Sequence, residues 1–213
     1  MPIDTNLEIH EKILTSAEAL FARHGYDGAS LRQITKTAKV NLAAVNYHFG
    51  DKQSLYCEVL TRRIRPINET RLDKLQKAEL TAGGSLVPLS VIIDLMVRPI
   101  FELGQDTVNG GHHTIRIIGR SLTEPQPFME ELLAREFQPV MMRLGQAVRR
   151  HVPNLTPEDF LWRLSFVVGA MHHTLATMHC MKELTRGICR NHDHEEALHR
   201  FQQFAVSAFI ASP

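Results

Sequence analysis

The sequence has few features of secreted or membrane proteins. Its three cysteines are odd in number and widely spaced, so they predict no disulfide framework and favour a reducing compartment. The most apolar stretch, residues 86–101, contains two charged residues and two prolines and is shorter than the ~20 residues that span a bilayer. The first twelve residues lack the apolar segment of a secretory signal. We therefore expect a cytoplasmic protein without a membrane partner.

The motifs of common enzymes are also absent. There is no Gly-x-Ser-x-Gly, no His-Glu-x-x-His and no phosphate-binding loop, and the acidic residues are scattered. We predict no enzyme, no catalytic residues and no cofactor. A metal-binding helical protein is the weaker alternative, because Cys180, Cys189, His192 and His194 offer soft and imidazole ligands. Without Cys-x-x-Cys or another defined ligand spacing, we predict no metal site.

The alternation of apolar and polar residues that is typical of strands is scarce, and apolar residues recur at helical spacing. This pattern predicts an all-α fold. Ser30 with Gln33 forms a capping box, and Asn41 is a good N-cap. These signals predict two short helices, the second of which ends at Phe49-Gly50. Longer helices are expected over residues 52–80, 86–104, 112–123, 127–151, 157–186 and 194–211.

Net charge is only +1, but its distribution is uneven. Residues 23–65 carry a net charge of +5, and the rest of the chain carries −4. A basic N-terminal segment on a mildly acidic body is typical of a nucleic-acid reader, although a plain surface bias could also produce it. Two short helices inside the basic segment can place the second helix in a major groove. Double-stranded operator DNA is therefore the predicted partner.

The sequence over residues 38–55, Ala-Lys-Val-Asn-Leu-Ala-Ala-Val-Asn-Tyr-His-Phe-Gly-Asp-Lys-Gln-Ser-Leu, closely resembles the DNA-binding signature of TetR-family regulators. The resemblance covers residues 8–60, and many family members carry Tyr where this chain has Asn46. The form of residues 41–49 is similar to a sub-branch that includes fatty-acid-responsive regulators. The resemblance implies a ligand-responsive homodimeric repressor. It implies a helix-turn-helix domain over residues 1–52 and a larger helical-bundle domain for ligand binding and dimerisation over residues 53–213.

If the second short helix enters the groove, Val45 and Phe49 face the core and the opposite face meets DNA. The Asn46 amide can pair with a base edge, and Leu42 or Ala43 can meet a thymine methyl. The resemblance implies that Tyr47, His48 and Lys52 touch phosphates, and Arg32 follows a capped helix start, which also favours phosphate. The predicted DNA-binding residues are Ser30, Arg32, Gln33, Asn41, Leu42, Ala43, Ala44, Asn46, Tyr47, His48 and Lys52.

The later helices carry apolar stripes that can line a pocket for a small-molecule effector or simply fill the core. Arg116 and Arg120 lie four residues apart, so they can bind an anionic head group. A fatty acid or acyl thioester is the first candidate, and a drug-like or aromatic effector of an efflux system is the alternative. The predicted ligand-binding residues are Ile93, Met96, Ile100, Ile115, Arg116, Ile118, Arg120, Leu122, Phe137, Met141, Phe166 and Met171.

The last two long helices are the predicted dimer interface. Apolar residues repeat at helical spacing on both, and a symmetric interface could bury them, although the core of one chain could do the same. The stripes consist of Phe160, Leu164, Val167, Val168, Met171 and Leu175 on the first helix and Leu198, Phe201, Phe204, Ala205 and Phe209 on the second.

Overall fold

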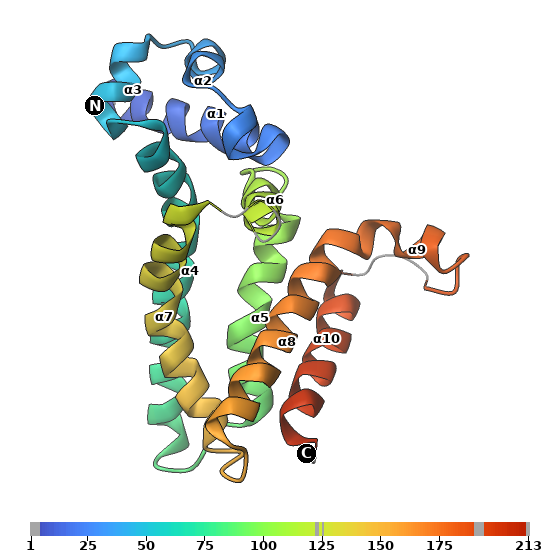
Figure 1. The fold of residues 1–213 in the computed structure, drawn as a ribbon. Helices are drawn as coiled ribbons and strands as arrows, with labels where there is room; N and C mark the ends of the chain where they lie inside the picture. Colours follow the sequence, from blue (N-terminus) through green and yellow to red (C-terminus); the bar gives the residue numbers. More distant parts are fainter. Residues whose placement is uncertain (1–4, 122–123, 125, 190–193, 212–213) are drawn as a thin grey trace. The chain divides into compact units, whose positions relative to one another are not determined.

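A computed structural model of the chain describes residues 5–121, 124, 126–189 and 194–211 (Figure 1). These residues form helices and connecting turns and include no strand, which confirms the all-α prediction. No described helix is long and apolar enough to cross a membrane. The elements are α1 (Thr5–Gly28), α2 (Leu31–Ala38), α3 (Leu42–Phe49), α4 (Lys52–Ala82), α5 (Leu89–Gln105), α6 (Gly111–Ser121), α7 (Pro127–Arg149), α8 (Pro157–Thr177), the 3-10 turn η1 (Met178–Cys180), α9 (Met181–Leu184) and α10 (His194–Ile210).

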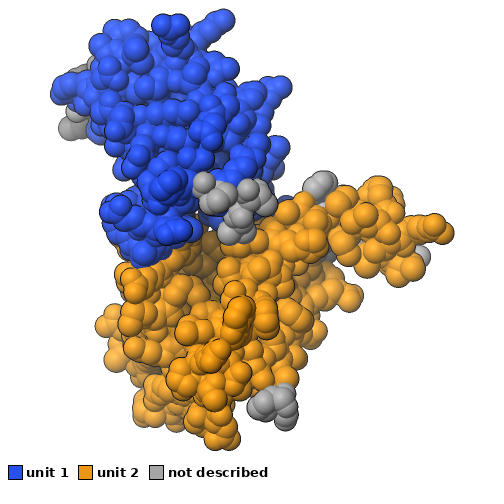
Figure 2. All heavy atoms as spheres, in the orientation of Figure 1, with its two compact units in different colours: residues 1–66, 103–136 blue, residues 67–102, 137–213 orange. Residues whose placement is uncertain are grey.

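The chain divides into two compact units (Figure 2). Unit 1 combines Met1–Pro66 with Leu103–Glu136, and unit 2 combines Ile67–Glu102 with Phe137–Pro213. Helices α4, α5 and α7 each contribute residues to both units. The predicted division at residue 52 concerns functional domains and stays a prediction.

In unit 1, helix α1 packs against α2, α3 and α6. Its apolar stripe supplies Ile13, Leu14 and Phe21, all essentially inaccessible to solvent. The helix is interrupted at Gly25, whose φ of 74° lies in the left-handed region. This backbone conformation is strained for any residue with a Cβ, so it favours glycine. Helix α1 continues to Gly28 beyond this interruption.

An aromatic cluster completes the core of unit 1. The rings of Phe21 and Tyr56 meet edge to face at 4.8 Å between centroids, and Tyr26 lies 5.0 Å from Phe128 and 5.2 Å from Tyr56. Such pairs add to the free energy that burial of the rings contributes. Burial also raises the pKa of Tyr56 to about 12. The cluster joins α1 to the first turns of α4 and α7.

Unit 2 is built around the apolar faces of α5, α7, α8 and α10. Phe101 packs on Phe201 with ring centroids 5.6 Å apart, and Phe160 packs on Phe209 at 5.7 Å. Arg163 on α8 donates hydrogen bonds to the carbonyl oxygens of Ala208, Phe209 and Ala211 at the end of α10. A cation at a helix C-terminus satisfies carbonyls that lack helical donors. Arg163 therefore ties α8 to the last turn of α10.

The predicted helix over residues 157–186 is wrong after residue 177. Helix α8 ends at Thr177, and the turn η1 and the short α9 follow. Side chains donate hydrogen bonds to backbone carbonyl oxygens here. The Thr177 hydroxyl donates to His173 O, Cys180 Sγ donates to Thr177 O, and the Thr185 hydroxyl donates to Met181 O. Such local bonds compete with the regular helical ladder.

The predicted helix start at residue 86 is also wrong. Helix α5 begins at Leu89, directly after Pro88. Proline disfavours the helical conformation of the residue before it, so Val87 stays outside the helix.

Candidate nucleic-acid interface

Helix α2 begins with the predicted capping box. Ser30 Oγ accepts a hydrogen bond from Gln33 N at 3.2 Å, and Gln33 Oε1 accepts one from Ser30 N at 2.8 Å. At the other end, Lys39 adopts a left-handed conformation with φ of 57°. The caps fix both ends of this eight-residue helix and leave a short turn before α3.

Helix α3 is anchored on one face and open on the other. Asn41 Oδ1 accepts a hydrogen bond from Ala44 N at 2.8 Å and caps the helix. Val45 is fully buried and Phe49 is 9% exposed. Away from these two side chains, Tyr47 is 77% exposed and Leu42 is 44% exposed. Ala43 and Asn46 are exposed as well. The open face thus offers an amide, a phenol and apolar groups together.

Aromatic contacts hold the end of α3. His10 of α1 stacks on Phe49 with ring centroids 4.7 Å apart and meets His48 edge to face at 5.6 Å. Tyr47 lies edge to face against His48 at 5.1 Å. The half-buried His48 ring therefore restricts the ring of Tyr47, whose other side faces solvent.

Lys52 opens helix α4 and lies over an aromatic ring. Its Nζ is 4.5 Å from the centroid of Tyr26, a cation–π distance. Burial, with the nearby carboxylates of Asp51 and Asp27, raises the pKa of the Tyr26 phenol, which stays neutral at physiological pH. The ring positions the ammonium group without neutralising its charge. Arg32 is exposed on α2.

The predicted DNA-binding set divides into two groups. The side-chain oxygens of Ser30, Gln33 and Asn41 serve as helix caps, so these residues orient α2 and α3. Side chains that are not used in caps supply the exposed surface. They are Arg32, Leu42, Ala43, Asn46 and Tyr47, with Ala44, His48 and Lys52 half-buried beside them.

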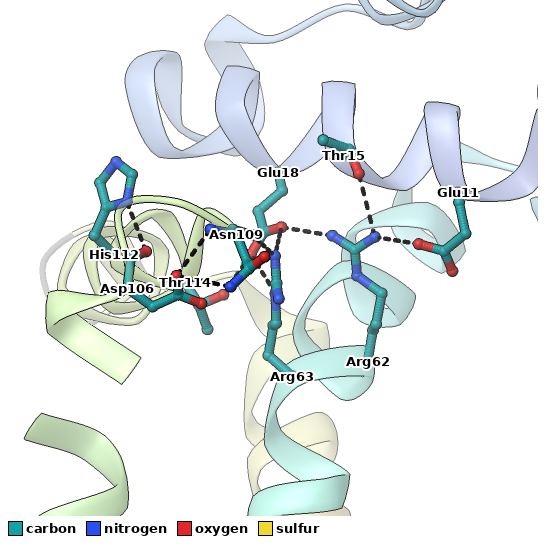
Figure 3. Close-up of polar contacts among 9 residues, drawn as sticks. All are labelled: Glu11, Thr15, Glu18, Arg62, Arg63, Asp106, Asn109, His112 and Thr114. Carbon is teal, nitrogen blue, oxygen red and sulfur yellow. Dashed lines mark hydrogen bonds and ion pairs between the residues drawn. The ribbon is translucent and has the colours of Figure 1, made fainter. Parts of the chain in front are cut away.

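A buried ionic network, which was not among the sequence-based predictions, connects elements of unit 1 (Figure 3). Glu18 of α1 is 1% exposed. Its carboxylate accepts hydrogen bonds from Arg62 Nη2 at 2.5 Å, from Arg63 Nε and Nη2 at 3.1 and 2.9 Å, and from Thr114 Oγ1 at 2.6 Å. Arg62 also pairs with Glu11 at 2.8 Å. The network fixes α1 to α4 and α6 within unit 1.

The residues predicted to line a ligand pocket are distributed over both units. In unit 2, Ile93, Met96, Ile100 and Met171 are buried, and Phe137 and Met141 are half-buried. In unit 1, Ile115 and Ile118 are buried and Arg116 is exposed. Leu122 lies outside the described residues.

Two of the predicted ligand-binding residues, Arg120 and Phe166, do not have the surroundings expected of pocket-lining side chains. Arg120 donates to Glu124 Oε1 at 3.0 Å and to the Arg23 carbonyl oxygen at 3.2 Å, so it is already engaged. Phe166 is 62% exposed on α8 and does not belong to the core of unit 2. The pocket itself stays a prediction. Among the described residues, no three His, Cys, Asp or Glu side chains form a cluster suited to a metal ion.

A capped helix pair with an open second helix defines a helix-turn-helix regulator, and comparison with known families gives the particular family. Residues 13–59 match the model described as bacterial regulatory proteins, tetR family. Residues 94–208 match the model described as tetracyclin repressor-like, C-terminal domain. The chain therefore belongs to the TetR family of transcriptional regulators.

Curated relatives match over part of the chain. A segment of 102 residues is 31% identical to the HTH-type transcriptional repressor AcnR of Corynebacterium diphtheriae and covers 46% of this chain and 47% of that protein. A segment of 46 residues is 41% identical to the biofilm operon icaADBC negative transcriptional regulator IcaR of Staphylococcus aureus, covering 22% and 25%. The chain thus spans less than half the length of either relative.

Solved structures share the fold over nearly the whole chain. The fatty acid degradation regulator FadR from Bacillus halodurans has a TM-score of 0.69 at 13% identity and covers 96% of this chain and 97% of that one. The hemolysin II transcriptional regulator HlyIIR has a TM-score of 0.56 at 17% identity, covering 97% and 99%. At these identities the likeness shows the fold alone.

Proposed function

We propose that this protein is a transcriptional repressor that binds a specific operator as a homodimer and releases it when a small apolar effector binds. The exposed face of α3 is the observation that carries this proposal. The buried side chains of Val45 and Phe49 anchor the helix, while Asn46 and Tyr47 are exposed to solvent. An α-helix of this kind fits the major groove of B-DNA.

The side chains around α3 suit two kinds of DNA contact. The Asn46 amide can donate to and accept from one adenine edge, and Leu42 or Ala43 can contact a thymine methyl. Arg32, Lys52 and Tyr47 suit phosphate oxygens, which position the protein without reading sequence. We assign base readout to Asn46, Leu42 and Ala43, and backbone contacts to the other side chains.

Dimerisation follows from the need to read two half-sites and from an exposed apolar surface on unit 2. One eight-residue helix reads too few bases for useful specificity, and two-fold dimers of such regulators read two half-sites one helical turn apart. On α8, Leu161, Trp162 and Phe166 are 62%, 56% and 62% exposed, and on α10 Phe204 is 49% exposed. We define these four residues as the α8–α10 surface.

The α8–α10 surface differs from the stripes expected from the sequence. Most members of the predicted stripes are buried within one chain. They are Phe160, Val167 and Met171 on α8 and Leu198, Phe201, Ala205 and Phe209 on α10. The core of unit 2 therefore uses most of the predicted interface. Gly169, also exposed on α8, has no atom within 4 Å of the position its Cβ would take. Its lack of a side chain allows a second helix to approach closely.

The experiment that tests the proposal is a gel shift with DNA from upstream of the protein's own gene, together with a mass measurement in solution. We expect a dimer whose affinity for this DNA falls steeply with salt and exceeds its affinity for unrelated DNA. A metal-binding helical protein without regulatory function would show no salt-dependent affinity for DNA.

The effector class is tested on the preformed protein–DNA complex. Fatty acids and acyl thioesters are the first candidates because the sequence of residues 41–49 resembles a fatty-acid-responsive sub-branch. Release of the operator requires the effector to bind one arrangement of the dimer more tightly than the other. Release by aromatic or cationic drugs, with no response to fatty acids, would favour the alternative of an efflux regulator.

A further inference from the structure

Arg71 of α4 is a buried cation in unit 2. It is 4% exposed, and no other arginine among the described residues is buried to this degree. Within the described part of the chain, no carboxylate lies within 4 Å of its guanidinium, whereas Arg98 and Arg143 of the same unit pair with glutamates. Burial lowers the pKa of Arg71 to about 10, which leaves it charged at physiological pH.

The partners of Arg71 are neutral oxygens. Its Nε donates to Leu95 O at 3.1 Å, Nη1 donates to Asn68 Oδ1 at 3.0 Å, and Nη2 donates to Met96 O. Leu95 is the residue four positions before Pro99 in α5, and proline has no N–H to donate to that carbonyl. Arg71 therefore replaces a helical bond that Pro99 removes. These contacts occupy three of the five N–H groups of the guanidinium.

The surroundings make a lone positive charge costly. The α5 residues next to these carbonyls are apolar and almost fully buried, including Ile92, Ile93 and Val97. Removal of a charged group from water is strongly unfavourable unless an opposite charge compensates for it. A neutral donor would satisfy the Leu95 carbonyl without that penalty, so the carbonyl alone does not account for an arginine at this position.

We propose that Arg71 is the anion-binding residue of the effector site and that the effector is an organic anion with an apolar body. This inference rests on the proposed effector response and adds the residue that binds the charged group of the effector. A carboxylate would accept the two N–H groups that the neutral oxygens leave over, and the apolar body would pack among α5 side chains. Arg71 thereby takes the role that the sequence analysis gave to Arg116 and Arg120.

The same contact supplies a means of response. A carboxylate binds a guanidinium more strongly than neutral carbonyl oxygens do. A carboxylate bound at the two remaining N–H groups therefore draws the guanidinium toward itself, which lengthens the bonds to Leu95 O and Met96 O and weakens the polar link between α4 and α5 inside unit 2. Helix α4, which carries Arg71, begins at Lys52, a proposed phosphate contact.

Calorimetric titration of the full-length protein without DNA tests the assignment. We expect decanoate to bind the wild-type protein at least ~30-fold more tightly than methyl decanoate, which has the same body but no charge. Arg71→Met should remove this preference, and Arg71→Lys should retain a reduced one because ammonium lacks the planar fork. Arg143→Met, which removes an exposed arginine of the same unit, should leave decanoate binding unchanged.

A second measurement needs only the wild-type protein, in case Arg71→Met does not fold. The carboxyl carbon of labelled decanoate is followed by NMR as pH falls, and a neighbouring guanidinium should hold the pKa of the bound carboxyl below that of free decanoate. Three outcomes would overturn the inference. They are equal affinity for decanoate and methyl decanoate, a carboxyl pKa that is unshifted or raised on binding, and loss of decanoate binding in Arg116→Met but not in Arg71→Met. These results do not depend on operator binding, so they are separable from failure of the proposed function.

Discussion

Glu18 of α1 and Arg63 of α4 are joined by two parallel hydrogen bonds, from Nε to Oε1 at 3.1 Å and from Nη2 to Oε2 at 2.9 Å. This fork is a strongly directional contact between α1, which packs against α2 and α3, and the long helix α4. Because the Glu18 carboxylate is buried, its charge must be matched inside the protein, and Arg62 supplies the second cation.

Replacement of Glu18 should destabilise unit 1. Glu18→Gln keeps the size of the side chain but removes the charge that Arg62 and Arg63 share. We expect a loss of about 3 kcal/mol in the free energy of unfolding, since breaking a buried ion pair leaves its partners uncompensated. Urea denaturation measures it. Glu58→Gln, on an exposed position of α4, is the matched control and should change stability by less than about 0.5 kcal/mol. Equal stability of both variants would contradict the role of the network.

Glu136 should make unit 1 sensitive to acid. Burial by itself raises the pKa of this carboxyl, but hydrogen bonds from Arg65 and Arg135, both at 3.0 Å, outweigh it and hold the pKa below its ordinary value of 4.5. A carboxyl whose pKa is lower in the folded state contributes stability above its unfolded pKa and loses that contribution as pH falls through the folded pKa.

Thermal unfolding between about pH 7 and about pH 3 measures this effect. Glu136→Gln should be less stable than the wild-type protein at neutral pH, and the difference should shrink below about pH 4.5 as the wild-type carboxyl protonates. A difference that stays constant over the whole range would mean that the ionisation of Glu136 does not contribute to stability.

Lys52 and Asn46 should affect DNA binding in different ways. Lys52→Ala should weaken binding to all sequences alike and reduce the slope of log affinity against log salt by about one unit per protomer. Asn46→Ala should relax the preference at one base position of each half-site, at a cost of roughly 1–3 kcal/mol. Titrations of operator and altered operators at several salt concentrations separate the two. Lys77→Ala, an exposed lysine of α4 in unit 2, should behave as the wild-type protein does.

Phe166 should be needed for dimerisation. Phe166→Glu places a charge within the α8–α10 surface, where burial against a second chain would leave it unpaired. Light scattering should give a monomer mass at micromolar concentration, and operator affinity should fall with it. Leu80→Glu, at a 74% exposed position on α4, tests whether any added surface charge has this effect and should remain dimeric. A dimeric Phe166→Glu would exclude this surface as the interface.

The sequence predicted the parts of the fold that local chemistry decides. The capping box of Ser30 and the N-cap at Asn41 identified the starts of α2 and α3, because their hydrogen bonds link positions three residues apart. The early end of α8 at Thr177 was not predictable from apolar spacing, which continues through residues 178–184. The hydrogen bonds made there by Thr177 and Cys180 became visible only in three dimensions.

Long-range partners account for the remaining differences. Glu18 lies on the same face of α1 as Leu14 and Phe21, and a carboxylate on an apolar face was a signal that could have revealed the network. Its partners Arg62 and Thr114 are far away in the chain, so spacing could not name them. For Phe166, periodicity could not decide which of two apolar faces of α8 is buried.

Trp162 is the only tryptophan of the chain, and it lies 56% exposed on the α8–α10 surface with its ring 5.8 Å from that of Phe166. The tryptophan fluorescence of the protein therefore comes from one indole at the proposed contact between two chains. Transfer of that indole from water to an apolar interface shifts its emission to shorter wavelength. The emission maximum of unlabelled protein should therefore move to longer wavelength as dilution dissociates the dimer.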